Sequence, residues 1–249
     1  MPHPHGAHPN VPPPNAQPGP ALGILTRAPH PGTTKTRLAR VIGNDAAAAL
    51  ATAMLQDTVQ ALHSHDWRTA LFVEPGPALD AVRTLTGHPD ALPQTAGDIG
   101  RRMQSAAATL FDDEHRPVVL VGTDIPALRA TAIHDALRAL AHNDADVVFG
   151  PAHDGGYYLI GLNQLRPGRE ARLFHHTIAW STDHVLARSE AVAAAAGLRA
   201  VRIETLTDID TAADLADLRA RLNTPGDHGP AAGPRTRALA MAIDLPADD

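Results

Sequence analysis

Short apolar runs alternate with longer segments of helical periodicity along most of this chain. The runs at 21–26, 68–74 and 117–122 are rich in Leu, Val and Ile, which is typical of strands buried on both faces of a parallel sheet. Between them, 45–65 and 98–113 place apolar residues at the spacing of an amphipathic helix. This alternation predicts a three-layer α/β/α sandwich around a mostly parallel, mixed sheet.

The alternation continues to residue 222. Further helices are expected at 78–86, 129–141, 182–196 and 211–222, and further strands at 145–152, 155–162 and 198–204. In open α/β sheets, ligands bind beyond the carboxyl ends of the strands. We therefore expect the functional residues directly after the strands.

The two ends of the chain depart from this pattern. Residues 1–20 are rich in Pro and His with few apolar side chains, which predicts a disordered tail; a weak metal-binding tract is the less favoured alternative. Residues 223–249 are predicted to form a second flexible tail, with one short helical turn near 237–243. The expected organisation is a single domain over 21–222.

The composition argues against several classes of protein. Of the 249 residues, 44% are hydrophobic and 19% are charged, and the net charge of −6 offers no basic surface for nucleic acid. The absence of cysteine excludes disulfides, thiolate zinc sites and cysteine nucleophiles. Without a long apolar run or a signal-peptide pattern, a cytoplasmic protein with neither membrane nor nucleic-acid partner is expected.

The loop after the first strand holds the only lysine of the chain. Lys35 stands in GTTKTR, after Gly32 and before Arg37, with Arg27 at the end of the strand. The loop is not a Walker A motif, because Pro29 occupies the position of the first glycine. A glycine turn followed by two cations suits a diphosphate, and an ordinary charged surface loop is the alternative.

Acidic residues follow two later strands. Asp124 comes directly after the run at 117–122, and Asp208 and Asp210 precede the last predicted helix. Mg²⁺ commonly takes one or two carboxylates and completes its shell with phosphates and water. Asp124 is therefore a candidate metal ligand; a helix N-cap is the alternative for both Asp124 and Asp210.

A pair of adjacent glycines interrupts the apolar stretch near residue 155. Asp154, Gly155 and Gly156 come directly before Tyr157. Glycine at such a place permits the close approach of a ligand, and a tight hairpin turn is the alternative.

A second glycine-containing stretch, QTAGDIGRRM, begins at a strand end. Gln94 is followed by Gly97 and Asp98 at the start of a predicted helix. A glutamine side chain can bond the edge of a nucleobase or the backbone of its own loop. All these motifs fall at the carboxyl ends of predicted strands, so together they indicate one site.

The order of these motifs resembles a known family. The segments PGTTKTRL, GDIGRRM, VGTDIPAL, FGPAHDGGYYLIGL, WST and DIDTAADL follow one another across residues 24–218. In this the chain resembles the bacterial glycosyltransferases associated with arsenosugar biosynthesis and radical-SAM enzymes. Those proteins have the nucleotide-diphosphosugar transferase (GT-A) fold and are related to MobA-like and phospholactate guanylyltransferases.

The resemblance implies a role for each motif. The phosphates of a nucleotide would be held by Arg27, Gly32, Lys35 and Arg37, and its base by Gln94, Gly97 and Asp98. Mg²⁺ or Mn²⁺ would be held by Asp124 and Asp210, and Lys35 would stabilise the leaving diphosphate. Asp154 would orient or deprotonate the acceptor hydroxyl, in a pocket completed by Gly155, Gly156, Tyr157, Trp180, Ser181 and Thr182.

The resemblance implies a metal-dependent transfer of a glycosyl group from a nucleotide-diphosphosugar to a small-molecule acceptor. One departure bears on that expectation, because glycosyltransferases of this fold carry Asp-x-Asp where this chain has a single acid, Asp124. A single acid is typical of the nucleotidyltransferase relatives. The alternative is therefore transfer of a nucleoside monophosphate from an NTP with release of pyrophosphate, and a catalytically inactive nucleotide-binding protein ranks third.

Overall fold

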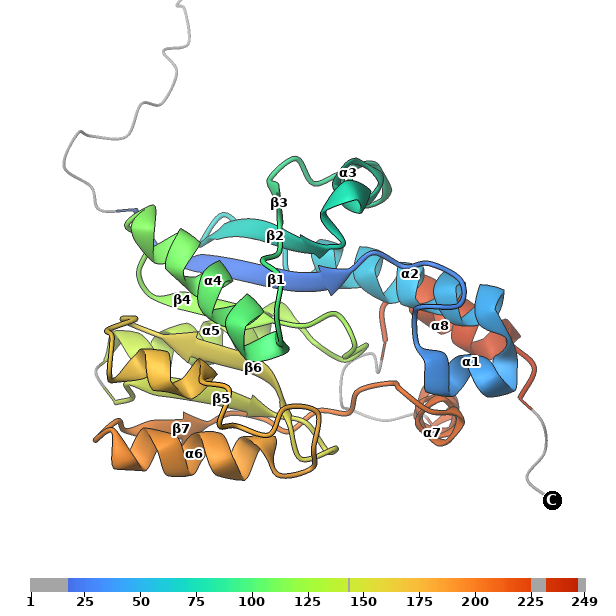
Figure 1. Ribbon diagram of the computed structural model, residues 1–249. Coiled ribbons are helices and arrows are strands. Elements are labelled where there is room, and N and C mark those ends of the chain that lie inside the picture. The colour runs from blue at the N-terminus through green and yellow to red at the C-terminus, as the bar shows by residue number, and fades with distance from the viewer. Residues whose placement is uncertain (1–17, 143, 225–231, 246–249) are drawn as a thin grey trace, which may run out of the picture.

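A seven-stranded sheet forms the middle layer of the protein (Figure 1). The structure, a computed structural model, describes residues 18–142, 144–224 and 232–245. The strands, in the spatial order β3-β2-β1-β4-β6-β5-β7, are β1 Ala21–Arg27, β2 Arg68–Glu74, β3 Ala91–Pro93, β4 Val118–Val121, β5 Val147–Pro151, β6 Tyr157–Leu162 and β7 Ala200–Arg202. Within this sheet β6 runs antiparallel to both β4 and β5, and the other pairs are parallel. The three-layer sandwich with a mostly parallel, mixed sheet is confirmed.

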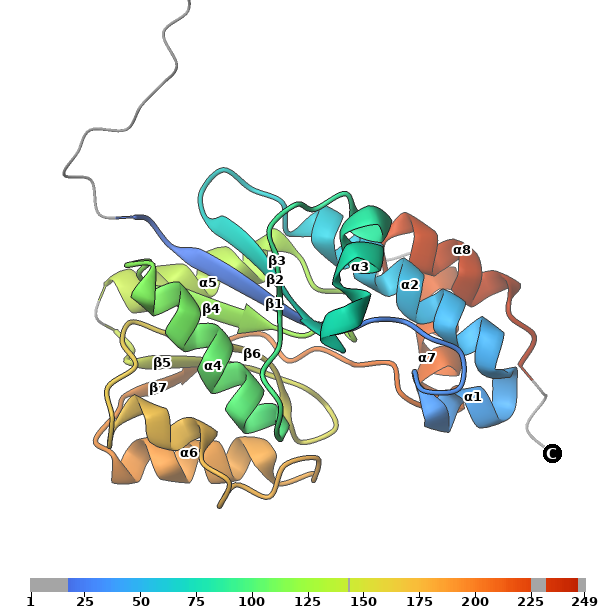
Figure 2. The same ribbon diagram turned by 45° about the horizontal axis from the view of Figure 1, so that its top comes forward.

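Helices cover both faces of the sheet (Figure 2). They are α1 Thr36–Ile42, α2 Asn44–Ala61, α3 Leu79–Thr86, α4 Ile99–Asp112, α5 Ala130–Ala141, α6 Val185–Ala195, α7 Ala212–Asn223 and α8 Pro234–Ala242. Helices α2, α3 and α5 pack with Leu22 and Ile24 of β1, whereas α4 and α6 pack with the cluster that includes Ala21 and Leu25. Alternate residues of one strand thus face opposite layers, which explains the continuous apolar runs in the sequence.

Most predicted helices and strands lie within a few residues of their expected positions. The elements that the sequence did not predict are short. The helix expected over 45–65 ends at Ala61. Helix α1 and strand β3 were not predicted, because seven and three residues carry too little periodicity. In the part of the chain that the structure describes, no helix has both the length and the apolar character needed to cross a bilayer.

Helix α8 corrects the expectation of a flexible C-terminal tail for residues 234–242. It packs along α2 (Figure 2), where the buried Asp57 carboxylate accepts a hydrogen bond from the Thr236 backbone N–H at 2.7 Å and one from Arg235 at 3.2 Å. A Cβ atom at residue 233 would lie 2.5 Å from Asp57 Cγ, so Gly233 allows this approach. These long-range contacts fix a segment whose own composition resembles a tail.

Other parts of the expected ends lie outside the described residues, namely 1–17, 225–231 and 246–249. The single domain expected over 21–222 stays a prediction. The ordered packing nevertheless extends past that range, since Ala232 and Ala240 belong to the same buried cluster as Leu38, Met54 and Leu218.

Replacing Asp57 by Ala is expected to lower the free energy of unfolding by about 1–3 kcal/mol, because the Thr236 N–H would stay buried without its acceptor. Urea unfolding monitored by circular dichroism measures this change. Asp80→Ala is the control, because the Asp80 side chain is 92% exposed and its pair with Arg83 should contribute little. Equal losses in the two variants would contradict the role given to Asp57.

Candidate active site

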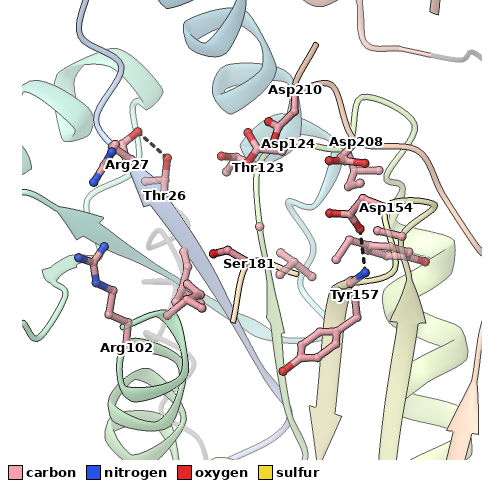
Figure 3. Close-up of a pocket in the computed structure, with 18 of the residues that line it drawn as sticks. Thr26, Arg27, Arg102, Thr123, Asp124, Asp154, Tyr157, Ser181, Asp208 and Asp210 are labelled. Carbon is pink, nitrogen blue, oxygen red and sulfur yellow. Dashed lines mark hydrogen bonds between the residues drawn. The ribbon is translucent and has the colours of Figure 1, made fainter. Parts of the chain in front are cut away.

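A cavity of about 600 Å³ lies at the edge of the sheet where β1, β2 and β4 end and the antiparallel β6 begins (Figure 3). Its wall includes these residues named from the sequence: Arg27, Lys35, Arg37, Gln94, Asp124, Asp154, Gly156, Tyr157, Trp180, Ser181, Thr182 and Asp210. The fold therefore brings together motifs that are up to 183 positions apart in the chain, from Arg27 to Asp210. This is the edge at which the sequence predicted a site.

Four residues named from the sequence lie in neighbouring turns instead of in the cavity wall: Gly32, Gly97, Asp98 and Gly155. Asp98 caps α4, because its carboxylate accepts a hydrogen bond from the Arg101 backbone N–H at 2.8 Å. A Cβ atom at residue 155 would lie 2.0 Å from the Asp183 carbonyl oxygen, so Gly155 is needed for packing against that segment. Contact with a ligand is not required to explain either residue.

The Lys35 ammonium lies between two carboxylates that also line the cavity. Its Nζ is 2.6 Å from Asp124 Oδ1 and 2.8 Å from Asp210 Oδ1, and only 6% of the Lys35 side chain is exposed. Burial alone would lower the pKa of Lys35, but the two carboxylates outweigh it and the pKa is raised. Burial would likewise raise the pKa of Asp210, yet the neighbouring Lys35 lowers it.

Backbone hydrogen bonds position the acidic segment beside this lysine. The Leu206 N–H donates to the Pro151 carbonyl at 3.0 Å, so the segment follows the end of β5. Three residues later the Ile209 N–H donates to the Asp124 carbonyl, also at 3.0 Å. The carboxyl end of β5, the turn after β4 and the segment before α7 are thereby held next to one another.

Neither acid serves as a helix cap, which was the alternative interpretation of both. Helix α7 has Thr211 as its N-cap, and Thr211 and Asp214 form a reciprocal capping box. Helix α5 has Arg129 as its N-cap. The carboxylates of Asp124 and Asp210 are consequently available to a cation in the cavity.

The chemistry of this pair fits a divalent ion. Two carboxylate oxygens that reach the same nitrogen are close enough together to share a metal, provided that the ammonium moves away. No cluster of three or more metal-binding side chains occurs among residues 18–142, 144–224 and 232–245. Mg²⁺ usually takes one or two carboxylates and completes its shell with water and substrate phosphate, so these two carboxylates suit it.

A second pair of carboxylates lines the same cavity, on the side of Asp124 and Asp210 that faces away from Arg27. Asp154 Oδ1 accepts a hydrogen bond from the Gly156 N–H at 2.8 Å, and Asp208 lies beside Asp154 (Figure 3). Burial, followed by the negative charge of Asp154, raises the pKa of Asp208 to about 6. Asp208 was not among the predicted site residues, although the motif TDID places it two positions before Asp210.

The opposite end of the cavity contains a charged group that the sequence interpretation missed. Glu74, the last residue of β2, accepts a hydrogen bond from Arg27 Nε at 2.9 Å, and Arg102 Nη1 lies 3.2 Å from the same carboxylate oxygen. The hydrogen bond from Arg27 is the main cause of a lowered pKa of Glu74. Because Glu74 ends β2, the expectation that functional residues lie at the carboxyl ends of strands would have identified it.

The Gln94 side chain has a fixed orientation beside this group. Its Nε2 donates to the Thr26 carbonyl at 2.9 Å and to the Phe72 carbonyl at 2.7 Å. Both amide hydrogens are therefore engaged by the backbone of β1 and β2, and not by the loop of Gln94 itself, which was one of the two alternatives. Because both neighbours are carbonyl oxygens, the amide cannot be reversed, and its Oε1 remains able to accept a hydrogen bond.

The WST segment forms the remaining wall. The Trp180 indole lies against the start of α4, where a Cβ atom at residue 100 would be 2.5 Å from the ring, so Gly100 makes room for it. Ser181 has a φ of 64°, a conformation that is costly for a residue other than glycine. Such local strain at a cavity wall is a frequent property of functional sites.

Replacing Asp208 by Asn is expected to stabilise the protein at pH 7 and to leave its stability unchanged at pH 4. A raised folded-state pKa means that stability present while Asp208 is protonated is lost as the pH rises from about 4 through 6. The expected gain at pH 7 is about 1 kcal/mol, since the half-exposed carboxyl is partly screened by solvent.

Urea unfolding in the presence of EDTA at pH 4 and pH 7 tests this expectation, with Asp80→Asn as the exposed control. An Asp208→Asn protein that loses as much stability between the two pH values as the unsubstituted protein would contradict it.

Curated proteins with a similar sequence are guanylyltransferases. The 2-phospho-L-lactate guanylyltransferase of Halorubrum lacusprofundi is 31% identical over 207 residues, which cover 80% of this chain and 84% of that protein. The phosphoenolpyruvate guanylyltransferase of Roseiflexus castenholzii is 32% identical over 126 residues, 51% of this chain and 56% of that protein. The relationship to phospholactate guanylyltransferases, which the resemblance implied, is confirmed.

Solved structures confirm the fold. A protein from Desulfovibrio desulfuricans G20, provisionally described as a nucleotide-diphospho-sugar transferase, superposes with a TM-score of 0.79 at 30% identity, over 90% of this chain and 94% of that one. A CMP:2-keto-3-deoxy-manno-octonic acid synthetase solved with CTP gives a TM-score of 0.51 at 11% identity, over 81% and 97% of the two chains, and shares the fold alone.

A family profile matches residues 57–182, and its description reads "Uncharacterized protein conserved in bacteria (DUF2064)". The narrower association with arsenosugar biosynthesis and radical-SAM enzymes stays a prediction. On the family profile and the 31% identity over four fifths of its length, the chain belongs to the DUF2064 family and is homologous to guanylyltransferases.

Proposed function

We propose that the protein is a nucleotidyltransferase that transfers GMP from GTP to a small-molecule acceptor and releases pyrophosphate. The observation that carries this proposal is the cluster of Lys35, Asp124 and Asp210 in the cavity of a chain related to guanylyltransferases. The single acid after β4 also favours nucleotidyl transfer over the glycosyl transfer that the resemblance implied.

The end of the cavity around Glu74 suits guanine. The carboxylate of Glu74 and the free Oε1 of Gln94 are hydrogen-bond acceptors. Guanine offers N–H donors at N1 and N2, while its O6 and N7 accept from arginine, here Arg27 or Arg102. Adenine has an acceptor at N1 and no amino group at C2, so it would leave these acceptors unpaired.

The phosphates of GTP would lie between this end and the acidic residues. Lys35 and Arg37 line that part of the cavity and supply positive charge for the triphosphate. Asp124 and Asp210 would hold a divalent ion, which when bound would neutralise charge on the phosphates. Stabilisation of the leaving pyrophosphate by the Lys35 ammonium should be the largest contribution of the chain's own groups.

The reaction itself is a substitution at the α-phosphorus. An oxygen of the acceptor forms a bond to this phosphorus, and the bond from the phosphorus to the oxygen that bridges to the β-phosphorus breaks. The bonding electrons leave with pyrophosphate. Asp154, which lines the same cavity, is the proposed group that orients the acceptor.

Glycosyl transfer from a nucleotide-diphosphosugar is the second candidate. The observation that favours it is the solved structure from Desulfovibrio desulfuricans G20, whose provisional description names that class and which matches at 30% identity. The same nucleotide and metal sites would serve this reaction.

Thermal unfolding with GTP, ATP, GDP and nucleotide-diphosphosugars, each with and without Mg²⁺, tests the proposal. GTP with Mg²⁺ is expected to give the largest stabilisation, about 2.7 kcal/mol at a concentration of 100 Kd. Asp124→Asn should remove the Mg²⁺-dependent part of this stabilisation, and Asp135→Asn on the exposed face of α5 serves as the control. A nucleotide-diphosphosugar that stabilises far more than GTP would favour the second candidate.

Replacing Glu74 by Gln is expected to reduce the preference for GTP over ATP. Loss of the carboxylate acceptor should cost about 1–3 kcal/mol of discrimination between the bases, measured by calorimetric titration of both nucleotides with Mg²⁺. Glu190→Gln is the matched control, since Glu190 also pairs with an arginine, Arg202, but lies outside the cavity wall. An unchanged preference in Glu74→Gln would exclude Glu74 from base recognition.

A further inference from the structure

Three polar side chains form a row across the edge of the sheet at the cavity. Arg27 of β1 is paired in register with Glu74 of β2. In the next pair of strands Val73 lies opposite Pro93, and the Gln94 N–H donates to the Val73 carbonyl at 2.8 Å. Gln94 is thus the neighbour of Glu74, and the row runs from the end of β1 through the end of β2 to the residue that follows β3.

The three side chains share the face of the sheet that α4 covers. The residues two positions before them pack in one apolar cluster with α4; they are Leu25, Phe72 and Leu92. Residues two apart on a strand lie on the same face. The ion pair of Glu74 with Arg102 of α4 agrees with this, and Figure 3 shows Arg27 and Arg102 on the same side of the cavity. Because all three members line the cavity, the row is presented to a bound ligand.

The row offers one hydrogen-bond donor followed by two acceptors. Arg27 uses its Nε on Glu74 Oε2, and its Nη atoms have no acceptor among the described residues. Arg102 engages the same Oε2 atom, so within the described chain Glu74 Oε1 has no donor. Gln94 Oε1 follows as the second acceptor. This order is complementary to the O6, N1–H and N2–H groups of guanine, which follow one another along one edge of the base.

Gln94 is the member of the row whose donor and acceptor ends cannot be exchanged. Its Nε2 donates to the carbonyl groups of Thr26 and Phe72. A reversed amide would lose both hydrogen bonds and place Oε1 against two carbonyl oxygens. The protein therefore presents an acceptor to the group at C2 of a purine, whichever purine is bound.

We infer that Gln94 is a specificity-determining residue, and that through it the nucleotide site requires the exocyclic 2-amino group of guanine. The inference rests on the proposed binding of GTP and goes beyond the preference for GTP over ATP. Hypoxanthine has the O6 and N1–H of guanine but no 2-amino group. It would satisfy Arg27 and Glu74 and leave Gln94 Oε1 without a donor, which is costly in a site that excludes water.

Calorimetric titration of the full chain with GTP and with inosine triphosphate (ITP), each with Mg²⁺, tests the inference. These two nucleotides differ only in the 2-amino group. GTP is expected to bind about tenfold more tightly or better, because a site built to bond a substrate group rejects the analogue that lacks it. Equal affinities for GTP and ITP would overturn the inference.

The variant Gln94→Met separates base recognition from a structural role. Methionine keeps an unbranched side chain but has no amide oxygen, so the ratio of GTP affinity to ITP affinity is expected to fall to about one. A residue that only supports the strand ends would weaken both nucleotides by the same factor, and an unchanged ratio would overturn the inference. Gln56→Met is the matched control, since Gln56 also donates from Nε2 to a backbone carbonyl, that of Leu85 at 2.9 Å, but lies outside the cavity wall.

The inference and the proposed function fail in distinguishable ways. If neither nucleotide binds in the presence of Mg²⁺, the proposed guanylyl transfer and the inference are both wrong. If GTP binds and ITP binds equally well, the proposed transfer stands and only the role of Gln94 is wrong.

Discussion

The ion triad of Lys35, Asp124 and Asp210 is the contact on which the geometry of the cavity depends. A buried ammonium is costly unless it is paired, so the two carboxylates must stay within reach of the loop after β1. The backbone hydrogen bond from the Ile209 N–H to the Asp124 carbonyl joins two of these three segments directly. Helix α7 begins two residues after Asp210, so the triad also positions the outer cluster in which α1, α7 and α8 meet α2.

Much of this fold follows from local sequence. The strands β1, β2 and β4 are buried on both faces, so their apolar runs identify them without knowledge of their neighbours. Helix α8 could not be identified in this way, because its place depends on the carboxylate of Asp57, 179 positions before Thr236. Strand β3 has three residues and is defined by its pairing with β2. A helix or strand that depends on contacts with residues far away in the chain cannot be recognised from its own short sequence.

The candidate site shows the same division between local and distant information. That Lys35, Asp124 and Asp210 lie at one edge follows from their positions after strands. That they form one charge cluster depends on a contact between residues 175 apart, which no spacing rule predicts. The orientation of Gln94 likewise requires two carbonyl groups from neighbouring strands. The sequence can thus predict which residues lie at the same site more readily than it can predict the hydrogen bonds and ion pairs of each side chain.

The charges around Lys35 affect how the metal ion and the nucleotide bind in the proposed reaction. The Lys35 ammonium is paired with both carboxylates, so a divalent ion alone would have to displace a paired cation and leave it without an anion. A triphosphate changes this balance, because its oxygens can receive the displaced ammonium while the metal takes the carboxylates. Each of the two ligands removes the electrostatic cost of binding the other. Metal and nucleotide should therefore bind together with positive cooperativity, a coupling that arises from the position of one lysine.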